Sequence, residues 1–302
     1  MMKRLLIGLG VVLILLGIAV WLEPTGVVLG FLHGEAFYRD RPTRHWCKAL
    51  TEPDPKTQVE ARQALKEGRR SALPVLVELL HSDNAKARWR AADLLGQMGT
   101  DAHDATPALV QTLKDSDPHV RAVAASALAA IGPAGPEAIP LLQDMLATEA
   151  RLPALRALAR CGSEAAPAIP PTIALLHDKQ SEVRWNAART LGKMGVAART
   201  TAPALMAALK DPDALVREHA AESLGQIDPD DKDTVPELIA MLQDPEAKVR
   251  RDAVRSLGQM GSKAKSAASA IRPLLDDKDA NVRKAAKIAL KQVNPHTKDK
   301  SD

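Results

Sequence analysis

The 302-residue sequence has few aromatic side chains, with two Phe, four Trp and one Tyr. Strands draw on aromatic and β-branched residues, and single-stranded nucleic acids stack on aromatic platforms, so this scarcity disfavours β-rich folds and base-stacking surfaces. Only two cysteines are present, and no Cys-x-x-Cys motif. The 46% apolar share is largely Ala and Leu, which are strong helix formers, and a net charge of +4 argues against disorder.

The main positive signal is an internal repeat of thirty-three residues. A Val-Arg pair recurs at 120–121, 183–184, 216–217, 249–250 and 282–283, with Ala87-Arg88 as a variant. A Leu follows each Arg by seven residues, a Gly usually follows that Leu by four, and an Asp precedes the Arg by six in five units. Such a period is typical of stacked supersecondary units.

Each repeat predicts two antiparallel helices. In one unit Val216, Ala220, Leu224 and Ile227 form a single apolar stripe at helical spacing. The Gly suits the residue that ends a helix, and a recurring Pro suits the first turn of the next. Since one pair cannot bury both faces, the pairs must stack as a solenoid. We expect an all-α fold of about eight pairs, beginning at Thr43.

The pattern Val-Arg-x-x-Ala-x-x-x-Leu-Gly-x-Met-Gly, after Leu-x-Asp-x-Asp, resembles the HEAT repeat, and more narrowly the bacterial phycobilisome-lyase-like HEAT subclass. The resemblance covers residues 43–294. It implies a right-handed superhelix whose Val-Arg helices line the concave face, with a structural Asp/Arg ladder along the turns whose aspartates also cap helices. The ladder residues it implies are Asp115, Arg121, Asp178, Arg184, Asp211, Arg217, Asp244, Arg250, Asp277 and Arg283.

An uncharged run near the amino end predicts a membrane anchor. Residues 5–22 follow Lys3 and Arg4, and as a helix they would span about 27 Å, close to the ~30 Å hydrocarbon core of a bilayer. We expect an uncleaved signal-anchor that binds the bilayer. A cleaved secretory signal is the alternative, although this run exceeds the usual apolar region of about 7–15 residues.

The anchor sets the expected domain order and location. The predicted parts are a basic region at 1–4, a transmembrane helix at 5–22, a juxtamembrane linker at 23–42, the repeat solenoid at 43–294 and a polar tail at 295–302. Lys3 and Arg4 favour a cytoplasmic amino terminus, although Arg39 and Arg41 weaken the bias. The expected localisation is a single-pass membrane protein with its solenoid exported.

The positions just after each repeated Arg vary between units and are candidate partner-binding sites. They include Trp89, Arg90, Trp185, Asn186, Glu218, His219 and Arg251. Trp and Arg are enriched at binding hot spots, so we predict a non-catalytic, membrane-anchored scaffold that binds other proteins. The alternative is that the Trp rings pack along a neighbouring helix with only their edges exposed.

An enzymatic alternative rests on Val216–Glu222, which is similar to deoxyhypusine hydroxylase, a HEAT-repeat enzyme that binds two irons through His-Glu pairs. Here the order is Glu218-His219, and no other Val-Arg helix contains a His-Glu pair, so we favour a surface histidine between acids. Phycobilin lyases share the repeat, but the sequence lacks a pigment-binding cysteine cluster. We expect no catalytic residue, metal ligand or cofactor.

Basic residues gather toward the carboxyl end, where 246–300 carry fourteen Lys or Arg and six Asp or Glu. This surplus suggests binding to nucleic acid or anionic lipid. A polar terminal cap, which a solenoid needs for solubility, explains the same charge. With no aromatic residues interleaved, we expect the cap and no nucleic-acid partner.

Overall fold

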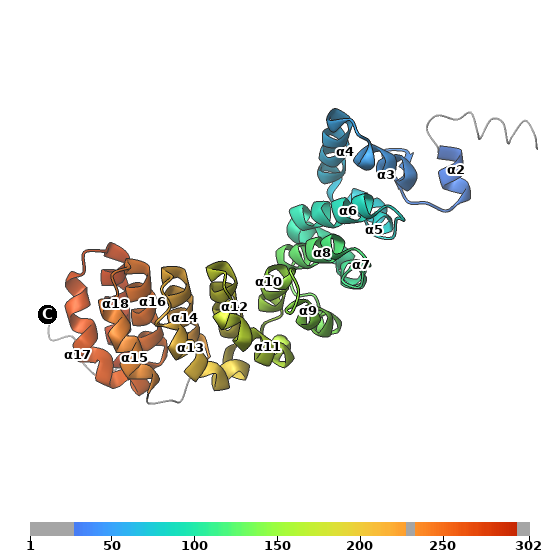
Figure 1. The fold of residues 1–302 in the computed structure, drawn as a ribbon. Helices are drawn as coiled ribbons and strands as arrows, with labels where there is room; N and C mark the ends of the chain where they lie inside the picture. The colour runs from blue at the N-terminus through green and yellow to red at the C-terminus, as the bar shows by residue number, and fades with distance from the viewer. Residues whose placement is uncertain (1–26, 228–232, 295–302) are drawn as a thin grey trace, which may run out of the picture. The chain divides into compact units, whose positions relative to one another are not determined.

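A computed structural model describes residues 27–227 and 233–294 (Figure 1). These residues belong to two compact units, one ending at Gly132 and the other beginning at Pro133. The elements of the first unit are α2 (Val27–Leu32), β1 (Phe37–Tyr38), β2 (Arg41–Pro42), α3 (Thr43–Thr51), α4 (Pro55–Gly68), η1 (Arg69–Ala72), α5 (Leu73–Leu79), α6 (Ala85–Met98), η2 (Gly99–Ala105), α7 (Thr106–Thr112) and α8 (Pro118–Ile131).

The second unit contains α-helices and short 3-10 helices, the latter labelled η. Its elements are η3 (Pro136–Ala138), α9 (Ile139–Met145), α10 (Arg151–Cys161), η4 (Gly162–Ala168), α11 (Ile169–Ala174), η5 (Leu175–His177), α12 (Ser181–Lys193), η6 (Gly195–Thr201), α13 (Ala202–Ala208), α14 (Ala214–Gln226), α15 (Thr234–Ala240), η7 (Met241–Gln243), α16 (Ala247–Gln259), η8 (Gly261–Ala267), α17 (Ala268–Ile271), η9 (Arg272–Asp276) and α18 (Ala280–Val293).

The predicted all-α repeat fold is confirmed over the described residues. The helices from α3 to α18 follow one another as eight pairs, each with a first helix (odd number) and a second helix (even number). Side chains such as Asp117 and Asp213 accept backbone N–H groups at the start of second helices, which stabilises those ends. Gly195 and Gly261 follow second helices with φ of 61° and 58°, a conformation that glycine adopts without strain.

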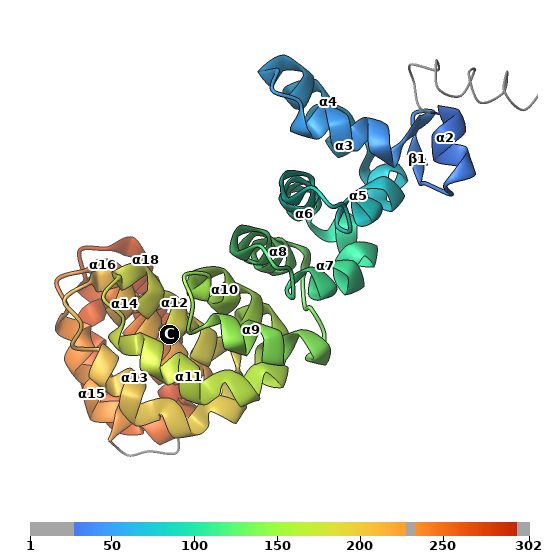
Figure 2. The same cartoon turned by 45° about the vertical axis from the view of Figure 1, so that its right-hand side comes forward.

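Second helices of the second unit pack tightly against one another. Figures 1 and 2 show α12, α14, α16 and α18 side by side, and these helices contact each other far more extensively than the first helices do. Small residues allow this approach, since a Cβ on Gly225 would lie 2.8 Å from Ser256 Cα. Because the more tightly packed layer lies inside any curve, the second helices line the inner side of this unit.

Hydroxyl groups connect the second helices at a regular interval. Ser256 Oγ donates to the Ala221 carbonyl at 2.6 Å, and Ser223 Oγ donates to the Ala188 carbonyl at 2.9 Å. Thr190 donates in the same way to the carbonyl of Leu155 at 3.1 Å. Each bond links residues thirty-five apart, so the repeat period brings a polar side chain to the same place on three successive helices.

The predicted linker, 23–42, contains the described residues 27–42, and these form a folded segment. After α2, strands β1 and β2 make an antiparallel hairpin in which Tyr38 faces Arg41. Tyr38 is buried and donates its hydroxyl to the Ala64 carbonyl at 3.0 Å. The Ala36 N–H donates to the Glu78 carboxylate at 2.6 Å. These contacts fasten the segment to the first helix pairs, so its described part is structured.

The predicted membrane localisation is wrong. No helix among residues 27–227 and 233–294 is long and apolar enough to cross a bilayer. The longest of these helices, such as α4 and α18, have 14 residues, against about 20 apolar residues for a span. The prediction of a single-pass membrane protein with an exported solenoid is therefore contradicted. The predicted span itself, 5–22, lies outside the described residues, as do 1–4 and 295–302.

Candidate functional site

The repeated Arg and Asp residues contact one another along the turns. Arg184 binds Asp211 with two hydrogen bonds, Nε to Oδ2 at 2.7 Å and Nη2 to Oδ1 at 2.9 Å. Its Nη1 donates to the Asp178 carbonyl at 3.0 Å, and Asp211 Oδ1 accepts the Asp213 N–H at 2.8 Å. Each such pair therefore joins the turns of neighbouring repeats. The same bidentate pairing joins Arg88 with Asp115, Arg217 with Asp244 and Arg250 with Asp277.

The partners in these pairs lie twenty-seven residues apart, a pairing that the predicted ladder did not specify. Asp115 binds Arg88, and Asp178 binds Arg151 through Nε at 2.8 Å; neither arginine was among the predicted ladder residues. Arg121 and Arg283 instead donate to backbone carbonyls of their own turns, at 2.7 Å in each case. The spacing from Arg184 to Asp211 is the signal that would have identified both missed arginines.

Hydrogen bonds and nearby charges lower the pKa values of aspartates in the ladder. The guanidinium of Arg88 donates to Asp115 and holds the pKa of that carboxyl below its ordinary value, against the opposing effect of burial. Arg250 does the same to the pKa of Asp277. In both pairs the arginine favours the charged form of its aspartate. The ladder is thus occupied with holding turns together.

Two of the predicted binding residues are buried. Arg90 is 8% exposed, and its guanidinium donates to the Leu50 carbonyl and to Gln58 Oε1, so it ties α6 to the first pair. Asn186 is 2% exposed and donates to the Glu182 carbonyl at 2.7 Å. Both point inward because their helical positions face a neighbouring helix. The structure therefore removes them from the predicted binding surface.

Trp89 and Trp185 are both half-buried. The rings of Trp89 and His119 meet edge to face, with centroids 5.3 Å apart. Trp185 stacks on His219, with ring centroids 5.1 Å apart and an interplanar angle of 27°. Each ring therefore packs along a neighbouring helix and keeps part of its surface accessible.

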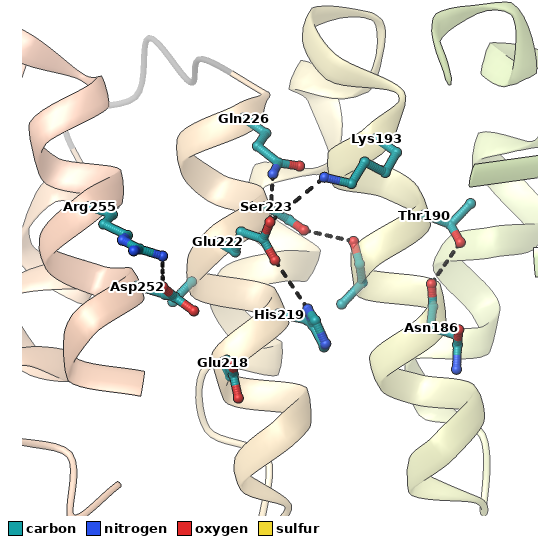
Figure 3. Close-up of polar contacts among 12 residues, drawn as sticks. Asn186, Thr190, Lys193, Glu218, His219, Glu222, Ser223, Gln226, Asp252 and Arg255 are labelled. Atoms are coloured by element: carbon teal, nitrogen blue, oxygen red, sulfur yellow. Dashed lines mark hydrogen bonds and ion pairs between the residues drawn. The ribbon is translucent and has the colours of Figure 1, made fainter. Parts of the chain in front are cut away.

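His219 belongs to a polar cluster on the inner face of the second unit (Figure 3). Its Nδ1 lies 3.2 Å from Glu222 Oε2, and Gln226 Nε2 donates to Glu222 Oε1 at 2.8 Å. Lys193 Nζ approaches Glu222 Oε1 at 3.7 Å. The hydrogen bond from His219, helped by the charge of Lys193, lowers the pKa of Glu222 from 4.5 to about 2 despite partial burial.

A second group of charges lies beside it, between α14 and α16. Arg251 Nη2 contacts Glu218 Oε1 at 3.2 Å and Asp252 Oδ2 at 2.7 Å, and Arg255 contacts Asp252 at 3.3 Å. An open cavity of about 180 Å³ is lined by Glu218, Glu222, Asp252 and both arginines, among others. A larger one, about 380 Å³, lies between α16 and α18 and shares Arg255 and Gln259 with the first.

The enzymatic alternative would use Glu218, His219 and Glu222 as metal ligands, and the structure does not bring these three side chains together. Glu218 contacts Arg251, while His219 contacts Glu222. Across 27–227 and 233–294, no three His, Cys, Asp or Glu side chains are placed to hold one metal ion. What the inner face does present is paired charges, amides and one stacked aromatic ring.

Glu222→Gln tests the electrostatics of this cluster. A carboxyl whose folded pKa is lowered stabilises the fold above its unfolded pKa, and that contribution disappears as pH falls toward the folded value. We therefore expect the variant to be less stable by about 1–2 kcal/mol at pH 7, a value reduced because the side chain is 36% exposed and solvent screens it. The deficit should shrink between about pH 5 and pH 2.

Urea denaturation of both chains across that pH range measures the difference, with Glu246→Gln as the matched control. Glu246 is exposed, and within the described residues its carboxylate makes no hydrogen bond or ion pair. Its charge acts on the guanidinium of Arg217 only through space, so its variant should stay within about 0.5 kcal/mol of wild type across this pH range. A deficit for Glu222→Gln that is constant with pH would contradict the assigned pKa.

Comparison with known proteins identifies the repeat. The model of HEAT repeats matches five overlapping stretches, 43–104, 74–153, 148–225, 169–244 and 202–291. The chain belongs to the HEAT-repeat family. An engineered protein of known crystal structure superposes on this HEAT chain with a TM-score of 0.59 and 24% identity, covering 83% of it and 78% of the engineered chain. This likeness shows the fold alone.

A second engineered protein matches with a TM-score of 0.41 and 22% identity over 84% of the HEAT chain and 96% of its own. No curated protein gives a significant sequence match. The HEAT resemblance seen in the sequence is thereby confirmed, and the scaffold architecture is consistent with a role in protein interaction.

Proposed function

We propose that this HEAT-repeat protein is a scaffold that binds other proteins through the inner face of its second unit, formed by α12, α14, α16 and α18. The observation that supports the proposal is that repeated positions and varying positions of the helix pairs have different structural surroundings. Positions that recur in most units are occupied by core residues and by the Arg–Asp ladder. Positions that differ between units, such as Trp185, Glu218 and Arg251, lie on second helices of this unit, and Glu218 and Arg251 line the smaller cavity.

The inner face is prepared for binding because its side chains are already held in place. Trp185 is stacked on His219, and Arg251 is fixed by Glu218 and Asp252. Ordering long side chains is a principal cost of association, so side chains held beforehand lower that cost. Half-buried Trp and Arg are also the residue types that dominate binding energy at interfaces.

The proposal assigns no catalytic residue and no cofactor to this face. The finer relationship to the phycobilisome-lyase-like HEAT subclass is part of the same proposal and is supported by the Val-Arg and Asp positions of the repeat. Because HEAT arrays serve many partners, the fold supports binding without selecting a partner.

Site-specific photocrosslinking tests the proposal with the full chain. We would replace Arg189, on α12 of the inner face, by p-benzoylphenylalanine and irradiate the chain in a lysate of its source cells. The matched control places the same group at Ala207, an exposed residue of the first helix α13. Adducts to other proteins are expected from Arg189, suppressed by excess unlabelled chain and reduced by Trp185→Ala. Adducts from Ala207 alone, or from neither position, would overturn the proposal.

A further inference from the structure

We propose that the groove between α16 and α18 binds a short acidic peptide segment that carries one apolar side chain. This inference rests on the proposed protein-binding function and names the kind of partner for one part of the inner face. The groove is the cavity of about 380 Å³, with α16 as one wall and α18 as the other. Its cations, amides and exposed apolar side chain are supplied by Arg255, Gln259, Asn281, Lys284, Ile288 and Gln292.

The charge of the groove favours an acidic ligand. None of its lining residues is acidic, whereas Arg255 and Lys284 contribute two cations from opposite walls. Arg255 is 60% exposed, and Asp252, the acid it contacts, is shared with Arg251. Lys284 is exposed and makes no ion pair within the described part of the chain. A carboxylate placed between the two walls therefore gains charge-assisted contacts with Lys284 and with the exposed part of Arg255, which also contacts Asp252.

The floor of the groove is apolar, so a ligand that fills it needs an apolar side chain as well as negative charge. Ile288 is 50% exposed and lies in the groove beside Ala285 and Ala289. Exposed large aliphatic residues are few on this unit, so Ile288 is a place where burial under an apolar side chain would be favourable. The ligand that satisfies both features has an apolar residue with acidic neighbours.

The side-chain amides indicate a peptide. Gln259, Asn281 and Gln292 each offer both a donor and an acceptor, the combination that an extended peptide backbone presents in return. Gln259 and Gln292 occupy equivalent positions on neighbouring helices, which pack about 8–10 Å apart. That separation corresponds to about three residues of extended chain at ~3.3 Å each.

Nucleic acid fits the same groove less well. A nucleic acid would use the two cations for phosphates, yet no aromatic side chain lines the groove to stack a base. Ile288 would then be covered by nothing apolar. The peptide and the nucleic acid therefore differ in a measurable way, since only the peptide depends on Ile288.

Fluorescence anisotropy with a defined probe tests the inference. The probe is an end-blocked, fluorescein-labelled pentapeptide of sequence Glu-Glu-Leu-Glu-Glu, used with the full chain at about 150 mM salt, where the Debye length is ~8 Å. Lys284→Glu is expected to weaken binding about tenfold, as is Ile288→Ser. The matched control is Arg272→Glu, which makes the same charge change at an exposed residue of η9 outside the groove, and its effect should stay below about twofold.

A second probe isolates the apolar contact. The peptide Glu-Glu-Ser-Glu-Glu should bind wild type as weakly as the leucine peptide binds Ile288→Ser, and it should lose nothing further on that variant. Circular dichroism confirms that each variant keeps its helicity. Equal binding of the leucine peptide to wild type and Lys284→Glu, or equal weakening by Arg272→Glu, would overturn the groove assignment.

A fluorescein-labelled single-stranded dodecanucleotide distinguishes the other class of partner. Binding of this DNA that is lost in Lys284→Glu but kept in Ile288→Ser, with no binding of the peptide, would replace the peptide by nucleic acid. Crosslinking from Arg189 is independent of these results because that residue lies on α12, away from the groove. If its adducts persist while the peptide fails to bind, the scaffold proposal stands and only the groove assignment falls.

Discussion

Asp244→Ala is expected to destabilise the second unit by about 3 kcal/mol, the typical cost of removing one partner of a buried ion pair. The Asp244 side chain is 5% exposed and accepts two hydrogen bonds from Arg217, at 2.8 and 3.1 Å. It also accepts the N–H of Glu246 at 2.9 Å. Removing the carboxylate leaves the guanidinium of Arg217 without its countercharge and a turn N–H without its acceptor, so both penalties act together.

Chemical denaturation followed by circular dichroism measures this loss, and a neighbouring substitution controls for it. Gln243→Ala changes an exposed residue one position earlier, and its free energy of unfolding should stay within about 0.5 kcal/mol of wild type. Asp244→Asn keeps an acceptor for the Glu246 N–H and should lose less than alanine does. Equal stability of Asp244→Ala and Gln243→Ala would mean that the ladder contributes nothing measurable.

Deletion of residues 214–246 is expected to leave a folded, shorter array. The deletion removes one whole repeat and joins Asp213 to Ala247, so Asp211 keeps its pairing with Arg184. Ser256 then occupies the place of Ser223 opposite the Ala188 carbonyl, because the two serines are thirty-three residues apart. Solenoid repeats contact mainly their neighbours, so a whole repeat can be removed without breaking a central core.

The control deletion removes fewer residues but disrupts the pairing. Deleting 214–226 takes out α14 alone and leaves two first helices, α13 and α15, in succession. Their apolar faces then lack a second helix between them, and we expect lost helicity and aggregation. Size-exclusion chromatography and helicity per residue distinguish the two chains. Aggregation of the 214–246 deletion, or a soluble 214–226 deletion, would contradict the repeat logic.

The helix pairs were predictable because the same apolar spacing and the same helix-ending glycine recur in several repeats. The apolar stripe that includes Val216 and Leu224 lies buried in α14, and the glycines that follow second helices have the positive φ of a helix end. The hairpin at 37–42 was missed because its strands are two residues each and have no detectable periodicity. Its position depends on distant contacts, such as the bond from Ala36 to Glu78.

The candidate site was predictable only as a set of positions. The thirty-three-residue period places Trp185, Glu218 and Arg251 at equivalent points of α12, α14 and α16, but it does not predict which side chains of the neighbouring helix each will contact. Arg90 and Asn186 occupy the next position along their helices, which faces a neighbouring helix, and both are buried. Burial at a given position depends on the side chains of the facing helix.

By itself, the sequence determined that this chain folds as stacked helix pairs, because periodic apolar residues, caps and glycines act within a few residues of one another. Tertiary structure alone decided which arginine meets which aspartate, that Trp185 stacks on His219, and that a cationic groove with an apolar floor opens between α16 and α18. Those outcomes join residues about one repeat apart, and they depend on how closely neighbouring helices approach and at what register.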